Sequence, residues 1–108
     1  MELPEGSNFF ANVLGEASAA AIARLYAAAG WRSRKCSWTD YEVTSEVAEL
    51  IIEGDPALLH GSVADPVHHG ALVLKPLREA SIAFACECYA PDGSILFAER
   101  WIPDGDDA

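Results

Sequence analysis

The sequence predicts an α+β fold in which two helices pack on one face of an antiparallel sheet of four to five strands. Two stretches repeat apolar residues at the spacing of helices, and several shorter stretches alternate between apolar and polar residues as strands do. The connections between them are short, which favours antiparallel pairing. The expected element order is α-β-β-(β)-α-β-β. With 108 residues, 51% of them hydrophobic, the chain is long enough for one domain over residues 1–108 and too short for two.

The first helix is expected over Phe9–Ala29, where apolar side chains recur at helical spacing and alanines of high helix propensity are frequent. Gly30 is the type of residue at which such a helix ends. The preceding residues 1–8 include a proline and a glycine, and we expect them to form a loosely ordered leader. Basic residues within 32–35 complement the partial negative charge of the last helical carbonyls.

Two or three strands follow the first helix. Residues 38–43 alternate, and the alternation loses step over 44–47 before it resumes over 48–53. A bulge or a tight turn is the physical way to absorb such a slip. The Gly-Asp-Pro sequence at 54–56 predicts a turn, and residues 58–63 read as a short third strand.

A second helix is predicted to begin at Asp65 and Pro66 and to reach about Ala80. The aspartate is expected to cap the helix with its carboxylate, and proline suits the first helical position. Pro76 either kinks this helix or separates two short ones, and the sequence leaves both possibilities open.

The last part of the chain predicts a hairpin. Residues 81–89 and 95–102 alternate on either side of a Pro-Asp-Gly turn, which is the pattern of two antiparallel strands. Residues 103–108 are acidic, and we expect them to form a loosely ordered tail.

Charge is distributed unevenly along the chain. Three basic residues face fourteen acidic ones beyond residue 35, a balance of −11, whereas residues 1–35 carry four basic and three acidic ones. This polarity repels nucleic acid and anionic membranes, and it attracts basic protein surfaces. We therefore expect a protein partner with a basic surface, no nucleic acid and no membrane.

The same composition indicates a cytoplasmic protein. The chain has no run of about 20 apolar residues, and its N-terminus lacks a cationic leader followed by an apolar stretch. Its three cysteines are an odd number, which excludes a closed disulfide framework.

Carboxylates on the expected strand faces are the leading candidates for a binding surface. Tryptophans that share a face with acidic residues resemble interface anchors, whereas carboxylates alone only keep a solvated sheet face from pairing edge to edge. If these residues form an interface, the protein is a small protein-binding module, and an inhibitor or immunity-type protein is the concrete example that we expect. The candidate interface residues are Trp38, Asp40, Glu42, Glu49, Glu53 and Trp101.

Cys86 and Cys88 point to the same face of one expected strand, because side chains two residues apart do so. Together with histidines elsewhere they are the chain's candidate metal ligands, but the spacing typical of structural zinc sites is missing. Cysteine is also among the most buried residue types. We expect both thiols in the core, and we expect no metal and no cofactor.

The sequence contains no catalytic motif, and we expect that the protein is not an enzyme. His60 is a candidate general base, since histidine titrates near neutrality, but a base also needs a nucleophile and an orienting carboxylate. The neighbouring His68 and His69 face different ways on a helix and make a poor chelate.

A small-ligand-binding domain is the alternative function. Alanines on the first helix and on the hairpin, such as Ala83, Ala85 and Ala98, leave room for a pocket between the helices and the sheet. The same small residues also allow helix and sheet to approach closely. A homodimer through the alanine face of the first helix or through an edge strand remains open.

Overall fold

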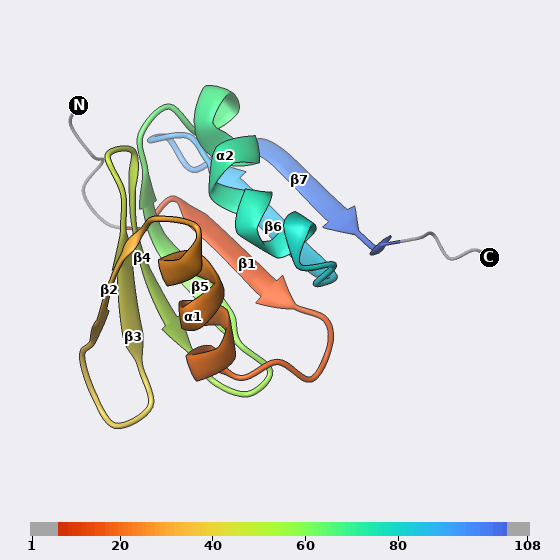
Figure 1. Ribbon diagram of the computed structural model, residues 1–108. Helices are drawn as coiled ribbons and strands as arrows, with labels where there is room; N and C mark the ends of the chain where they lie inside the picture. The colour runs from red at the N-terminus through yellow and green to blue at the C-terminus, as the bar shows by residue number, and fades with distance from the viewer. Residues whose placement is uncertain (1–6, 104–108) are drawn as a thin grey trace.

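A computed structural model describes residues 7–103, which form one seven-stranded antiparallel sheet and two helices (Figure 1). The order of strands across the sheet is β2-β3-β4-β5-β1-β6-β7. The elements are β1 (Phe9–Val13), α1 (Ala19–Ala28), β2 (Arg32–Lys35), β3 (Tyr41–Thr44), β4 (Ala48–Glu53), β5 (Leu58–Val63), α2 (Pro66–Glu79), β6 (Phe84–Tyr89) and β7 (Ile95–Trp101).

The predicted α+β class is confirmed, whereas the predicted count of four to five strands is wrong. The two additional strands are β1 and β2. Strand β1 lies within the range predicted for the first helix, and β2 lies in the basic segment just after it. The predicted leader over 1–8 and tail over 103–108 fall outside the described residues, apart from positions 7, 8 and 103.

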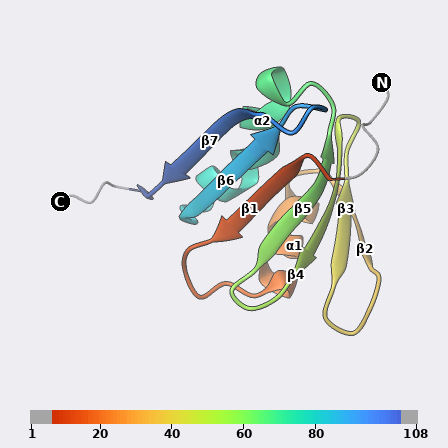
Figure 2. The ribbon, with the colours of Figure 1, turned by 180° about the vertical axis from the view of Figure 1, so that it is seen from behind.

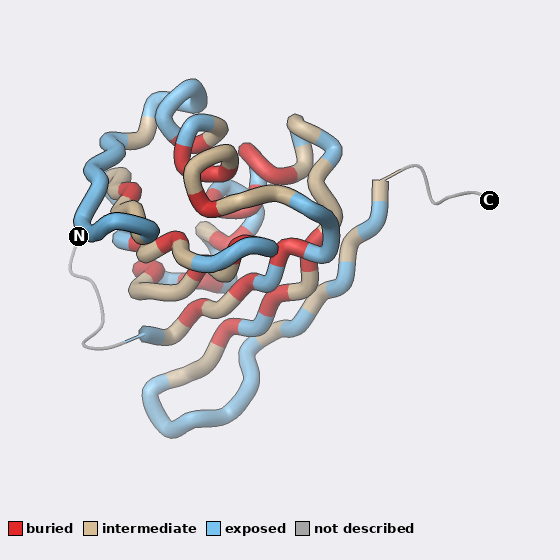
Figure 3. The backbone as a smooth tube through the Cα atoms, turned by 90° about the horizontal axis from the view of Figure 1, so that it is seen from below, coloured by how far each residue is buried: buried red, intermediate tan, exposed pale blue. Residues whose placement is uncertain are grey.

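Both helices lie against the same face of the sheet (Figures 1 and 2). The helix α1 packs on β2, β3 and β4, and α2 packs on β5 and β7. Their packing differs from the prediction, because α1 is much shorter than expected and each helix covers its own half of the sheet. Buried and accessible residues alternate along the strands (Figure 3), so the core fills the space between the helices and this one face.

The prediction of a continuous helix over Phe9–Ala29 is wrong for its first half. Phe9, Ala11 and Val13 are buried at every second position, and β1 pairs with β5 on one side and β6 on the other. Asn8 directly precedes the strand, and its side chain fixes this end to β5: the Nδ2 donates to the Val63 carbonyl (3.0 Å) and the Oδ1 accepts from the Val63 N–H (2.8 Å).

The helix itself begins only at Ala19, where the Ser18 hydroxyl caps it by accepting from the Ala21 N–H (3.2 Å). Ala19 and Ala23 are buried in the core. Ala20 and Ala21 of the same helix are half-buried, and Ala27 and Ala28 are exposed.

Strand β2 also departs from the prediction. Its four residues, Arg32–Lys35, are all exposed and pair with β3 at one edge of the sheet. Three cations in four residues suit an edge strand, because charge discourages pairing with another chain. The turn that leads into β2 is closed by the Trp31 N–H, which donates to the Tyr26 carbonyl (3.0 Å).

The structure settles the open question about Pro76, which lies inside the single helix α2. Pro66 occupies the start of this helix, as predicted, but Asp65 does not cap it with its side chain. The backbone of Asp65 is left-handed (φ +47°), and its carboxylate lies 2.6 Å from the His68 Nδ1 instead. The predicted hairpin is confirmed as β6 and β7, with a register shift between Cys88 and Tyr89.

Candidate protein-binding surface

The face of the sheet opposite the helices is the largest feature that the fold leaves open. Among residues 7–103, no helix lies against it (Figure 2). The strand register places one row of side chains across this uncovered face. In spatial order, the row consists of Arg34, Glu42, Ile51, His60, Phe10, Glu87 and Ala98.

Aromatic side chains form the centre of the uncovered face. The Phe10 ring stacks on His60, with 6.4 Å between centroids and 17° between planes, and it meets Tyr89 edge-on at 5.9 Å and 80°. Ile51 is the cross-strand neighbour of His60. All four side chains are only half-buried. This half-buried apolar cluster thus lies on a layer that no other element of residues 7–103 covers.

Two hollows lie beside Phe10 and give this face relief. One of about 350 Å³ is bordered by Phe10, Asn12 and Arg100, with the small side chains of Ala85 and Ala98 among its lining. The other, of about 660 Å³, lies toward the turn between β6 and β7, and Phe10 and Tyr89 line it as well. Phe10 therefore lies between two depressions of this face.

Four carboxylates lie on the uncovered face, namely those of Glu42, Glu49, Glu53 and Glu87. Three of them have partners there: the Glu42 Oε1 is 2.8 Å from the Arg34 Nη2, the Glu53 Oε2 is 3.1 Å from the His60 Nε2, and the Glu87 Oε1 accepts from the Tyr89 hydroxyl (2.5 Å).

The basic residues of this face come from the two edge strands alone, Arg32 and Arg34 on β2 and Arg100 on β7. Four acidic against three basic residues give a balance of −1. The acidic groups of this face thus lie on the inner strands β3, β4 and β6, and the face accounts for only a small part of the chain's net charge of −10.

Trp38 and Asp40 are not on a strand, because β3 begins only at Tyr41. The alternation predicted from residue 38 onward is wrong there, because the Ser37 hydroxyl accepts from the Thr39 and Asp40 N–H groups (3.3 and 3.1 Å) and curls the chain into a loop. The Trp38 side chain is 91% exposed at this loop, next to the turn that joins β4 to β5.

Trp101 lies on the helix side of the sheet, away from the carboxylates with which the sequence analysis grouped it. It pairs with Phe84 across β6 and β7 and stacks on that ring at 5.7 Å. The Arg78 guanidinium lies 5.2 Å from the Phe84 ring and 5.5 Å from the Trp101 ring, and it donates to the Glu99 carboxylate (2.7 Å). These contacts explain Trp101 as part of the packing beneath α2.

Of the six predicted interface residues, the structure brings Glu42, Glu49 and Glu53 together on β3 and β4, leaves Trp38 and Asp40 in the adjoining loop, and separates Trp101. The sequence analysis missed Phe10 and Tyr89. The sequence signal for Phe10 is the alternation of residues 9–13, which is typical of a strand. We predicted a helix there because the alanine-rich stretch that follows has helical spacing.

Both hairpin thiols lie in the core, with Cys86 and Cys88 facing the helices, whereas Cys36 is exposed. Burial raises the pKa of Cys86 to about 11 and that of Cys88 to about 12, so both stay protonated at neutral pH. Within the part of the chain that the structure describes, no three histidine, cysteine or acidic side chains converge on a point where a metal ion fits.

We predict that the native protein has one reactive thiol. Only the thiolate attacks a disulfide reagent, so at pH 8 we expect Cys36 to react at once and the other two only after unfolding. Colour release from an aromatic disulfide reagent measures this, and a Cys36→Ser variant is expected to lose the fast phase. Three fast thiols in the native protein would contradict the burial described here.

His60 lies within hydrogen-bonding distance of Glu53 and stacks on Phe10, and both of these contacts lie on the uncovered face.

Neither α1 nor α2, the helices of residues 7–103, is long and apolar enough to cross a membrane. The chain matches no protein-family model, no curated protein and no solved structure.

Proposed function

We propose that the protein is a small protein-binding module that docks a basic partner through the uncovered face of its sheet. The observation that carries this proposal is the half-buried cluster of Phe10, His60 and Tyr89 on a face that no layer of residues 7–103 covers. Accessible aromatic groups at the centre of a surface, with polar groups around them, have the arrangement of an interface anchor.

Charge supports a basic partner. The net charge of −10 attracts a basic protein over a distance and raises its association rate by about 10- to 1,000-fold at low salt. At contact, the exposed carboxylate of Glu49 on the uncovered face faces a partner's lysine or arginine, and so does the exposed carboxylate of Glu87, which also accepts from the Tyr89 hydroxyl. An inhibitor or immunity-type protein that neutralises a basic enzyme is the concrete version of this function.

A reducing compartment such as the cytoplasm fits the proposal. Cys86 and Cys88 are free thiols in the core, and Cys36 is a free thiol on the surface. Cytosolic proteins keep their thiols in this state.

The proposed function predicts salt-dependent binding. We expect affinity purification at low salt to recover a partner of high isoelectric point, whose association rate falls by at least about tenfold between 50 and 300 mM salt because screening weakens steering. Surface plasmon resonance at the two salt concentrations measures both rates. A neutral or acidic partner whose association rate is the same at both salt concentrations would exclude this function.

A further inference from the structure

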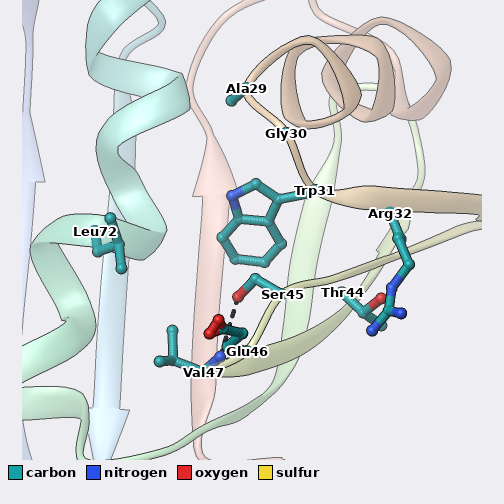
Figure 4. A pocket seen from close by; sticks show the side chains of 9 residues that line it. All are labelled: Ala29, Gly30, Trp31, Arg32, Thr44, Ser45, Glu46, Val47 and Leu72. Atoms are coloured by element: carbon teal, nitrogen blue, oxygen red, sulfur yellow. Dashed lines mark hydrogen bonds between the residues drawn. The ribbon is translucent and has the colours of Figure 1, made fainter.

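A groove of about 520 Å³ lies on the helix side of the molecule, where the end of α1 meets the turn between β3 and β4 (Figure 4). It is separate from the uncovered face, and the sequence analysis assigned it no role. Trp31 stands in it, with Leu72 of α2 across from the indole and Ser45, Glu46 and Val47 of the turn below.

The Trp31 indole is held in place from behind. Its ring packs edge-on against Tyr26, with 4.9 Å between centroids and 88° between planes. Tyr26 is fully buried, and its hydroxyl donates to the Val73 carbonyl (2.8 Å), which ties α1 to α2. A rigid indole that remains half-exposed presents its π-system to the groove.

Two charged residues line the groove, Glu46 and Arg32. Glu46 is exposed, and no basic side chain within residues 7–103 forms an ion pair with it. The last turn of α1 contains no basic residue, so the partial negative charge of its C-terminus has no neighbouring cation within the helix. Arg32 points away from the indole on the far side of Thr44 (Figure 4).

We propose that this groove receives an arginine or lysine side chain of the basic partner. The cation lies against the Trp31 indole, which attracts it through the quadrupole of the ring, and faces the Glu46 carboxylate. The apolar stem of such a side chain packs on Val47 and on Leu72, which is 50% exposed. The identity of the carrier rests on the function proposed above, whereas the chemistry of the groove does not.

The test uses a small probe, so that it does not depend on the partner. N-acetyl-arginine amide carries one positive charge, and N-acetyl-citrulline amide has the same shape without the charge. The indole N–H signals of the ¹⁵N-labelled full chain are followed during titration with each probe, after assignment through single tryptophan-to-phenylalanine variants. We expect the Trp31 signal to shift saturably with the arginine probe, and to shift at least threefold less at equal concentration with the citrulline probe.

Two carboxylate variants complete the test. Glu46→Gln is expected to weaken binding of the arginine probe by about threefold, the scale of an exposed ion pair. Glu16→Gln, at an exposed carboxylate outside the groove, is expected to leave the affinity of the probe unchanged. Equal shifts with both probes, no saturable shift of Trp31, or no effect of Glu46→Gln would each overturn the groove's assignment. Docking on the sheet face would stand in those cases, because the salt dependence of partner binding tests it separately.

Discussion

Replacing Phe10 with alanine is expected to weaken the partner's binding by at least about 30-fold, the loss that corresponds to truncating an interface hot spot worth about 2 kcal/mol. The reason is geometric: Phe10 holds the centre of the uncovered face, contacts both His60 and Tyr89, and borders both hollows. Isothermal titration calorimetry with the recovered partner measures the change.

Val67→Ala is the matched control for Phe10→Ala. Val67 is 65% exposed and lies on α2, on the other side of the sheet, so its truncation removes apolar surface without touching the uncovered face. We expect wild-type affinity for this variant, and wild-type circular dichroism for both. If both variants bind as tightly as the wild type, or if Val67→Ala alone loses binding, the docking surface lies elsewhere.

Gly61→Ala is expected to have the largest effect on stability. A Cβ atom at Gly61 would lie 2.0 Å from the Glu49 carbonyl oxygen and 2.9 Å from the Leu50 Cα, both of them backbone atoms of β4. The strand must move to admit it, since neither atom is the end of a flexible side chain. We expect a loss of about 3 kcal/mol in the free energy of unfolding, at the upper end of the range for overpacking, measured by urea denaturation.

Gly15→Ala provides the comparison for this effect. A Cβ atom at Gly15 meets no other atom within 4 Å, and its φ does not lie in the left-handed region. We expect this variant to stay within about 1 kcal/mol of the wild type, with a small gain from the reduced freedom of the unfolded chain. Equal urea midpoints for the two variants would show that β4 and β5 do not approach as closely as the structure has them.

Local patterns predicted the parts of this fold that depend on neighbours along the chain. The hairpin of β6 and β7 is confirmed because alternation on both sides of a turn specifies its own pairing partner. Strand β1 was missed because Phe10 and Leu14 fit helical spacing, while the pairing with β5 and β6 that makes a strand is contributed by residues about 50 and 75 positions away.

The candidate surface was predictable only in part for a related reason. Alternation alone places Glu49 and Glu53 on one face of β4, but the neighbour of each residue depends on strand order and register. The stack of Phe10 on His60 joins two strands that the sequence does not make adjacent. Trp101 faces the helices because it pairs with the buried Phe84. The sequence alone does not show that this face of the sheet lies opposite the one with the carboxylates of β3 and β4.

We propose that a basic partner covers the sheet face that the helices leave open. Cross-saturation from the unlabelled partner to the labelled protein maps the contact surface in solution. We predict that side-chain signals of Phe10, Ile51 and Tyr89 lose intensity on complex formation, and that those of Val67 on α2 do not. Loss of intensity over α1 and α2, with the signals of Phe10 and its neighbours unchanged, would contradict the account.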